Sequence, residues 1–106
     1  MDRRLQLDNE LREVLQEAVG YVNLYYQPPA SVRMQYDAIR YEEMTMYPRH
    51  ADDRAYLIRT EYQVIVISRD PDSPIPRMIQ ERFPLCRPGR KYAADNLYHY
   101  PFTIYY

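Results

Sequence analysis

The sequence predicts an α+β fold: a mostly antiparallel sheet with an N-terminal helix and a second, short helix packed on one face, and a long β-hairpin that projects from it. Three observations predict this class. The chain opens on an amphipathic stretch, and segments rich in aromatic and β-branched residues follow it. The order of the segments is helix, three strands, helix, two strands. The length of 106 residues fits a single domain over residues 1–106.

The N-terminal helix is predicted by apolar side chains that recur at spacings of three and four. They are Leu7, Leu11, Val14, Leu15, Ala18 and Val19. Gly20 stands where a left-handed C-cap residue ends a helix. The start is open between Asp2 and Asp8, because either side chain can cap the first turn.

Two strands follow. Residues 21–26 predict a short strand that Pro28 and Pro29 end, because proline cannot donate to a ladder. Residues 37–46 predict a second strand, whose apolar side changes near Glu43. A bulge has this effect, as does a strand whose far end leaves its own core and meets a neighbouring subunit.

The third strand covers residues 56–68, with its even positions on one semi-apolar face. Residues 64–67 are apolar without alternation, which predicts burial on both faces at this end. Together with the second strand it predicts the long hairpin, whose tip extends beyond the domain. A polar connection over residues 47–53 joins the two strands.

A turn over residues 70–74 precedes the second helix. Ser73 is expected to cap this helix and Pro74 to take its first position. Its apolar stripe is formed by Ile75, Met78, Ile79 and Phe83, and Pro84 ends it.

The last part of the chain begins with a basic turn over residues 87–91. Residues 92–96 form a weak strand or a loop, and residues 97–106 form the last strand, with the even positions on one face. Pro101 is expected at an edge or a bulge.

Composition excludes several classes of protein. Cys86 is the single cysteine, so there is no disulfide framework and no cysteine-rich metal site. The longest apolar run is too short for a membrane span, and the charged N-terminus does not resemble a secretory signal. A net charge of −1 gives no overall attraction to nucleic acid or to membranes.

Two residue types are unusually frequent. The chain has 13 tyrosines, and its 14 basic residues are all arginine except Lys91. Tyrosine and arginine are enriched at protein interfaces, whereas lysine is depleted there. A plain bias toward arginine codons is the alternative explanation.

Catalytic and metal-binding patterns are weak. His50 and His99 have only Asp52, Asp53 and Asp95 as candidate co-ligands, and no compact ligand motif occurs. Cys86 follows an apolar stretch and is expected to be a small core residue rather than a nucleophile paired with His99. Two glycines cannot build a phosphate loop. We therefore expect no metal, no cofactor and no enzymatic activity.

The only compact basic patch is formed by Arg87, Arg90 and Lys91. The other arginines alternate with acidic residues, which favours salt-bridged surfaces and interfaces over a track for phosphates. A small nucleic-acid-binding module rich in arginine and tyrosine therefore remains an alternative function.

Four segments carry a resemblance to a known family. They are residues 24–29 (LYYQPP), 62–67 (YQVIVI), 70–76 (DPDSPIP) and 92–99 (YAADNLYH). In order and spacing they resemble the tail terminator or tail-completion proteins at the head-tail junction of tailed bacteriophages. The resemblance covers the chain from about Asn23 onward.

The resemblance implies a structural protein of the virion, assembled in the host cytoplasm. Its α+β subunits would form a ring, commonly a homohexamer, that caps the tail tube and joins the tail to the head connector, with genomic DNA passing through the lumen. The implied partners are further copies of the chain, the tail tube protein and the connector or adaptor proteins, without a membrane. Another neck or head-closure adaptor is the neighbouring alternative, and the family offers no catalytic residues.

Subunits of a ring use two different faces, which suits the broken alternation of the hairpin. We expect one set of residues at contacts with neighbouring subunits or the tube: Met44, Met46, Tyr47, Arg49, Arg54, Arg59 and Glu61. A second set, Arg87, Arg90 and Lys91, is expected to face the lumen or the connector.

Overall fold

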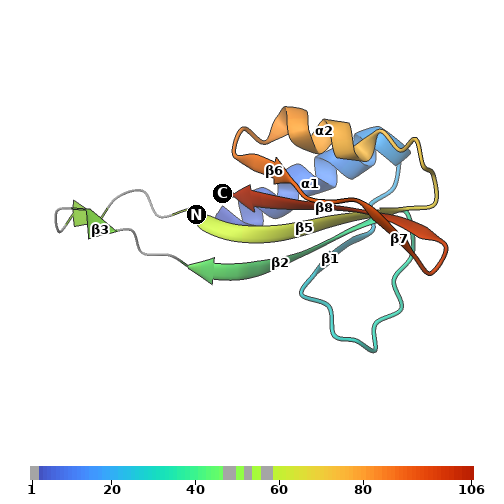
Figure 1. Ribbon diagram of the computed structural model, residues 1–106, viewed down its shortest axis with the longest axis horizontal. Coiled ribbons are helices and arrows are strands. Elements are labelled where there is room, and N and C mark those ends of the chain that lie inside the picture. The colour runs from blue at the N-terminus through green and yellow to red at the C-terminus, as the bar shows by residue number, and fades with distance from the viewer. Residues whose placement is uncertain (1–2, 47–49, 52–53, 56–58) are drawn as a thin grey trace.

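The computed structural model describes residues 3–46, 50–51, 54–55 and 59–106 (Figure 1). Two helices and a six-stranded sheet make up the body of the fold, and two short strands pair with each other outside it. In chain order the elements are α1 (Arg3–Val19), β1 (Leu24–Tyr26), β2 (Ala38–Met46), β3 (His50–Ala51), β4 (Arg54–Ala55), β5 (Thr60–Ser68), α2 (Ile75–Arg82), β6 (Cys86–Pro88), β7 (Tyr92–Ala94) and β8 (Leu97–Tyr105).

The sheet is mostly antiparallel, as expected. Its strand order is β1-β2-β5-β8-β6, and β7 pairs with the same side of β8 farther along. Only β1 runs parallel to its neighbour, β2. Both helices cover the same face of the sheet, and the opposite face carries no helix (Figure 1). We call this uncovered side the open face. The predicted α+β class is therefore confirmed.

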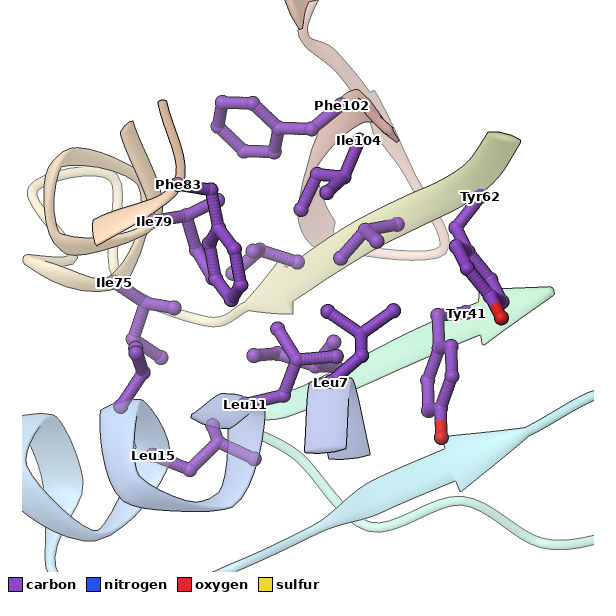
Figure 2. Close-up of a cluster of buried hydrophobic side chains, with 14 residues drawn as sticks. Leu7, Leu11, Leu15, Tyr41, Tyr62, Ile75, Ile79, Phe83, Phe102 and Ile104 are labelled. Atoms are coloured by element: carbon purple, nitrogen blue, oxygen red, sulfur yellow. The ribbon is translucent and has the colours of Figure 1, made fainter. Parts of the chain in front are cut away.

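The core lies between the helices and the sheet. Leu7, Leu11 and Leu15 of α1 have no exposed surface and meet Ile75 and Ile79 of α2 above the strands (Figure 2). The strands contribute their helix-facing side chains, which are Ile39, Tyr41, Tyr62, Val64, Val66, Phe102 and Ile104. The spacing of three and four predicted in the sequence is thus the spacing of the buried face of α1.

Gly20 ends α1 in the predicted way. Its φ is +80°, in the left-handed region, and its N–H donates to the carbonyl of Gln16 at 3.1 Å. A Cβ built on Gly20 would meet no atom within 4 Å. The glycine is therefore needed for its backbone conformation and not for space.

Replacing Gly20 by alanine is expected to lower the free energy of unfolding by about 1 kcal/mol, because an L side chain disfavours this φ. Urea unfolding followed by circular dichroism measures the loss. Gly20→Asn is the matched control, since asparagine tolerates the left-handed region better, and it should lose less. Equal stability of the alanine variant and the parent would contradict the assigned role.

The predicted bulge lies in β2. Residues 38–43 pair with β5 in one register, and the register then shifts by one residue between Glu43 and Met46. The shift follows the change of apolar side in the sequence, and it leaves Met44 49% exposed. The residues beyond Met46 include positions 47–49, 52–53 and 56–58, which lie outside the described residues. The projecting tip of the hairpin therefore stays a prediction, and β5 is described from Thr60 rather than from residue 56.

Burial at the end of β5 differs in one residue from the prediction. Val64, Val66 and Ile67 are buried, but Ile65 is only half-buried. Ile65 alternates with the core residues Val64 and Val66, so its side chain belongs to the open face. The apolar run is therefore not buried on both faces along its whole length.

The start of α2 is one residue later than predicted. The helix begins at Ile75 with Pro74 in the capping position, so Pro74 is not its first residue. Ser73 still supports this end, because its hydroxyl oxygen accepts the N–H of Ile75 at 3.3 Å.

The basic turn over residues 87–91 is partly a strand, which the sequence did not predict. Residues 86–88 pair with β8 as β6, and β7 pairs with β8 in a register one residue different. Pro101 lies where the two registers meet, and its carbonyl accepts the N–H of Gly89 at 2.8 Å. Pro101 is thus at an irregularity of the ladder, as expected, although β8 itself is an interior strand.

Candidate interaction surface

Three residues of the first predicted contact set, Met44, Arg59 and Glu61, lie at the bulged end of the β2–β5 pair. Met44 is exposed on β2, Arg59 is exposed just before β5, and Glu61 is half-buried at the start of β5. The start of α1 and the end of β8 lie at this same end of the sheet (Figure 1). Tyr47 and Arg49 lie outside the described residues, and the side chains of Met46 and Arg54 do as well.

Arg59 lines an open depression that it shares with Arg3, Gln6 and Tyr106. The backbone of Tyr106 exchanges two hydrogen bonds with Thr60, at 3.0 and 3.2 Å, which brings the end of β8 beside the start of β5. Within the part of the chain that the structure describes, neither Arg3 nor Arg59 has a carboxylate within ion-pair distance. No local pattern in the sequence indicates this group, because it depends on the pairing of two segments more than 40 residues apart.

Other arginines at this end are engaged within the chain. The Arg4 guanidinium lies 4.3 Å from the centre of the Tyr26 aromatic ring and donates to the Tyr41 hydroxyl at 3.3 Å. The Tyr41 hydroxyl donates to Asp8 at 2.5 Å, and Asp8 also pairs with Arg12. Burial, and then the hydrogen bond to Asp8, hold the pKa of Tyr41 well above its usual value. These groups join α1 to the sheet.

A second engaged group joins both helices to the end of the chain. Arg82 of α2 pairs with Glu10 and Glu13 of α1, and the Tyr106 hydroxyl donates to Glu10. Burial, and then this hydrogen bond, raise the pKa of Tyr106 to about 12. The high arginine and tyrosine content thus serves internal packing in part, and not only external contacts.

The second predicted set lies on a different strand. Arg87 is in β6, and Arg90 and Lys91 connect β6 to β7; all three are exposed. These three residues lie beside β8, on the side away from β5. Met44 lies on β2, and β5 separates β2 from β8. Among the described residues, the two predicted sets therefore lie on different strands of the sheet.

Beside these cations lies an aromatic pair that the sequence reasoning missed. Tyr92 and His99 are direct ladder partners, with aromatic ring centres 4.7 Å apart and planes 12° from parallel. The His99 Nδ1 is 3.2 Å from the carbonyl oxygen of Leu97, and Tyr92 is 48% exposed. Both residues were visible in the sequence, but only the register of β7 on β8 brings them together.

Cys86 and His99 do not form a catalytic pair. Cys86 is the ladder partner of Ile104, five residues from His99 on β8, which places the two about 17 Å apart along the strand. Cys86 packs against the core, and burial raises the pKa of its thiol. The expected role of Cys86 as a small packing residue agrees with this position.

Among the described residues, no three histidine, cysteine or carboxylate side chains gather as metal ligands would. In the same residues no helix combines the length and the apolar character needed to cross a membrane.

Comparison of the chain with protein-family models, with curated proteins and with solved structures found no match.

Proposed function

We propose that the chain is a structural subunit of a tailed-bacteriophage neck. Copies of it form a ring, a homohexamer, that caps the tail tube and joins the tail to the head connector while genomic DNA passes through the lumen. It acts without a cofactor and catalyses no reaction. A neighbouring neck adaptor is the second form of the same proposal. The proposal begins from the resemblance of four segments to tail terminators.

The observation that carries the proposal is the exposure of contact-forming side chains at the bulged end of the β2–β5 pair. A large apolar side chain, Met44, is about half exposed beside a bulge, and Arg59 lies nearby at the same end without an ion pair among the described residues. Methionine and arginine are enriched where proteins meet. A neighbouring subunit or the tail tube would cover them.

The edges of the sheet favour side-chain contacts over continuous strand pairing between subunits. The outer strand β1 has three residues, and Pro28 follows it closely. On the other side β6 ends in Pro88, which has no N–H to donate. Short edges that carry proline resist pairing with another chain, so a heterologous contact would use the faces and ends of the fold.

Met44→Asp is expected to weaken assembly, because it places a charge in the proposed contact. The protein concentration needed to form oligomers should rise at least tenfold. The measurement is native mass spectrometry and analytical ultracentrifugation of the chain, alone and with purified tail tubes. Folding should not change, since the side chain is already about half exposed.

Val32→Asp is the matched control, because Val32 is 40% exposed in the loop between β1 and β2. It should assemble like the parent chain. A parent chain that stays monomeric both alone and on tail tubes would overturn the proposed function. A Met44→Asp variant that assembles normally would overturn the proposed contact.

A further inference from the structure

Positive charge is concentrated on the segment that pairs with β8 on the side away from β5, and this charge forms no ion pair among the described residues. Arg87, Arg90 and Lys91 are exposed, and within the described residues no carboxylate lies within ion-pair distance of them. Arg12 and Arg82, by contrast, pair with carboxylates of α1. The three cations therefore contribute little to holding this fold together.

The surroundings of these cations contain few acidic groups. Residues 86–94 include no aspartate or glutamate. The positions of β8 that alternate onto the open face are also free of acid: Leu97, His99, Pro101, Thr103 and Tyr105. Asp95, in the turn before β8, is the first acidic residue beyond β7. These two sets of residues thus carry positive charge and no acidic group, although the whole chain has a net charge of −1.

Tyr92 and His99 are ladder partners of β7 and β8, and the stacked His99 ring holds the Tyr92 ring in place. Stacking at 4.7 Å fixes the aromatic ring of Tyr92, which is nevertheless 48% exposed. A fixed and exposed phenol is a hydrogen-bond donor of the kind that contacts phosphate oxygens in protein–DNA complexes. We call Arg87, Arg90, Lys91 and Tyr92 the basic strip.

The length of the basic strip suits a phosphate backbone. Arg87 is the ladder partner of Thr103, and Tyr92 is the partner of His99. Four residues of strand separate these partners, or about 13 Å. One strand of B-DNA rises by about 3.4 Å along the helix axis for each phosphate, so a strip of this length can reach more than one phosphate.

We propose that the basic strip binds the phosphate backbone of duplex DNA without sequence preference. Arg87, Arg90 and Lys91 approach phosphate oxygens, and the Tyr92 hydroxyl donates to another. The inference deepens the proposed function and rests on it for the source of the DNA. It assigns these cations to DNA, where the sequence left DNA and the connector open.

The test measures binding of a 20-base-pair duplex by fluorescence anisotropy over a series of salt concentrations. The variant R87A/R90A/K91A is expected to bind at least tenfold more weakly at low salt. The slope of log affinity against log salt concentration should be shallower by about 2.7 for this variant, since each of the three lost phosphate contacts removes about 0.9 from the slope. Far-ultraviolet circular dichroism confirms that the variant is folded.

The matched control is R33A/R69A/R77A, which removes three exposed arginines outside the basic strip and has the same net charge. It should keep most of the parent affinity and salt dependence. Equal losses in the two triple variants would overturn the inference, because net charge alone would then explain binding. So would a parent chain that does not bind the duplex at low salt.

Three further outcomes separate this inference from the alternatives. Polyglutamate that competes as well as DNA at equal charge would overturn it in favour of an acidic protein partner. Rings that assemble normally but fail to bind DNA would overturn the basic strip and leave the proposed function standing. A chain that binds DNA through the basic strip but stays monomeric both alone and on tail tubes would support the strip and overturn the ring.

Discussion

Replacing Leu11 by alanine is expected to lower the free energy of unfolding by about 2–5 kcal/mol, the range for large-to-small changes in a closed core. Leu11 has no exposed surface and lies at the centre of the cluster that joins both helices to the sheet (Figure 2). Domains of this size are stable by only about 5–15 kcal/mol, so the variant loses a large fraction of its stability. Urea unfolding monitored by circular dichroism provides the measurement.

Leu5→Ala is the matched control on the same helix. Leu5 is 50% exposed, so the same chemical change removes little buried surface, and the loss should stay within about 0.5 kcal/mol. Losses of similar size at the two positions would mean that α1 does not pack on the sheet through the face that carries Leu11.

Local patterns predicted most of the fold because they record which side of each element is buried. The spacing of three and four in α1, the glycine at its end and the even-numbered face of β5 each follow from contact with one core. The change of apolar side near Glu43 even located the bulge of β2. Such features are set within a few residues, so a single sequence reveals them.

Features that depend on pairing between distant segments were not predictable. The strand β6 has only three residues and little alternation, and it forms because the side of β8 away from β5 is free to accept it. The stacking of Tyr92 on His99 depends on the register of β7, which no local pattern states. The grouping of Arg3 and Arg59 depends in turn on the pairing of Thr60 with Tyr106.

The same reasoning explains why arginine and tyrosine content was only a partial guide to function. Arg4 and Arg82 are engaged by a hydrogen bond and an ion pair between elements, and Arg12 pairs with Asp8 within α1. Tyr41 is a fully buried part of the core. Composition does not separate these residues from exposed ones such as Arg87. The distinction requires the burial and the partners of each side chain.

Buried and hydrogen-bonded tyrosines predict a loss of stability in alkaline solution. Burial is the first cause of a raised pKa at Tyr41, Tyr100 and Tyr106, and for Tyr106 the pKa rises from 10.0 to about 12. At Tyr41 and Tyr106 the hydroxyl also donates to a carboxylate of α1, so that ionisation would place two negative charges side by side.

The direction of the effect follows from proton binding. Between pH 10 and pH 12 the unfolded chain releases the Tyr106 proton while the folded chain retains it, so the unfolded state binds fewer protons and stability falls as the pH rises. Below pH 10 both states hold the proton, and the contribution of the neutral hydroxyl is fully present. Tyr41 acts in the same direction.

Thermal unfolding followed from pH 8 to pH 12 tests this account with phenylalanine variants. Tyr106→Phe keeps the aromatic ring that lies edge-on to Phe83, and Tyr41→Phe keeps the ring beside Tyr26, so each variant removes only the ionisable hydroxyl and its hydrogen bonds. Each is compared with its own midpoint at pH 8, which separates the lost hydrogen bonds from the titration. Each single variant should show a shallower fall of the midpoint above pH 10 than the parent, and the double variant the shallowest. A double variant that falls as steeply as the parent would show that other groups cause the alkaline transition, because the only ionisations removed are those of the two hydroxyls that join α1 to the sheet.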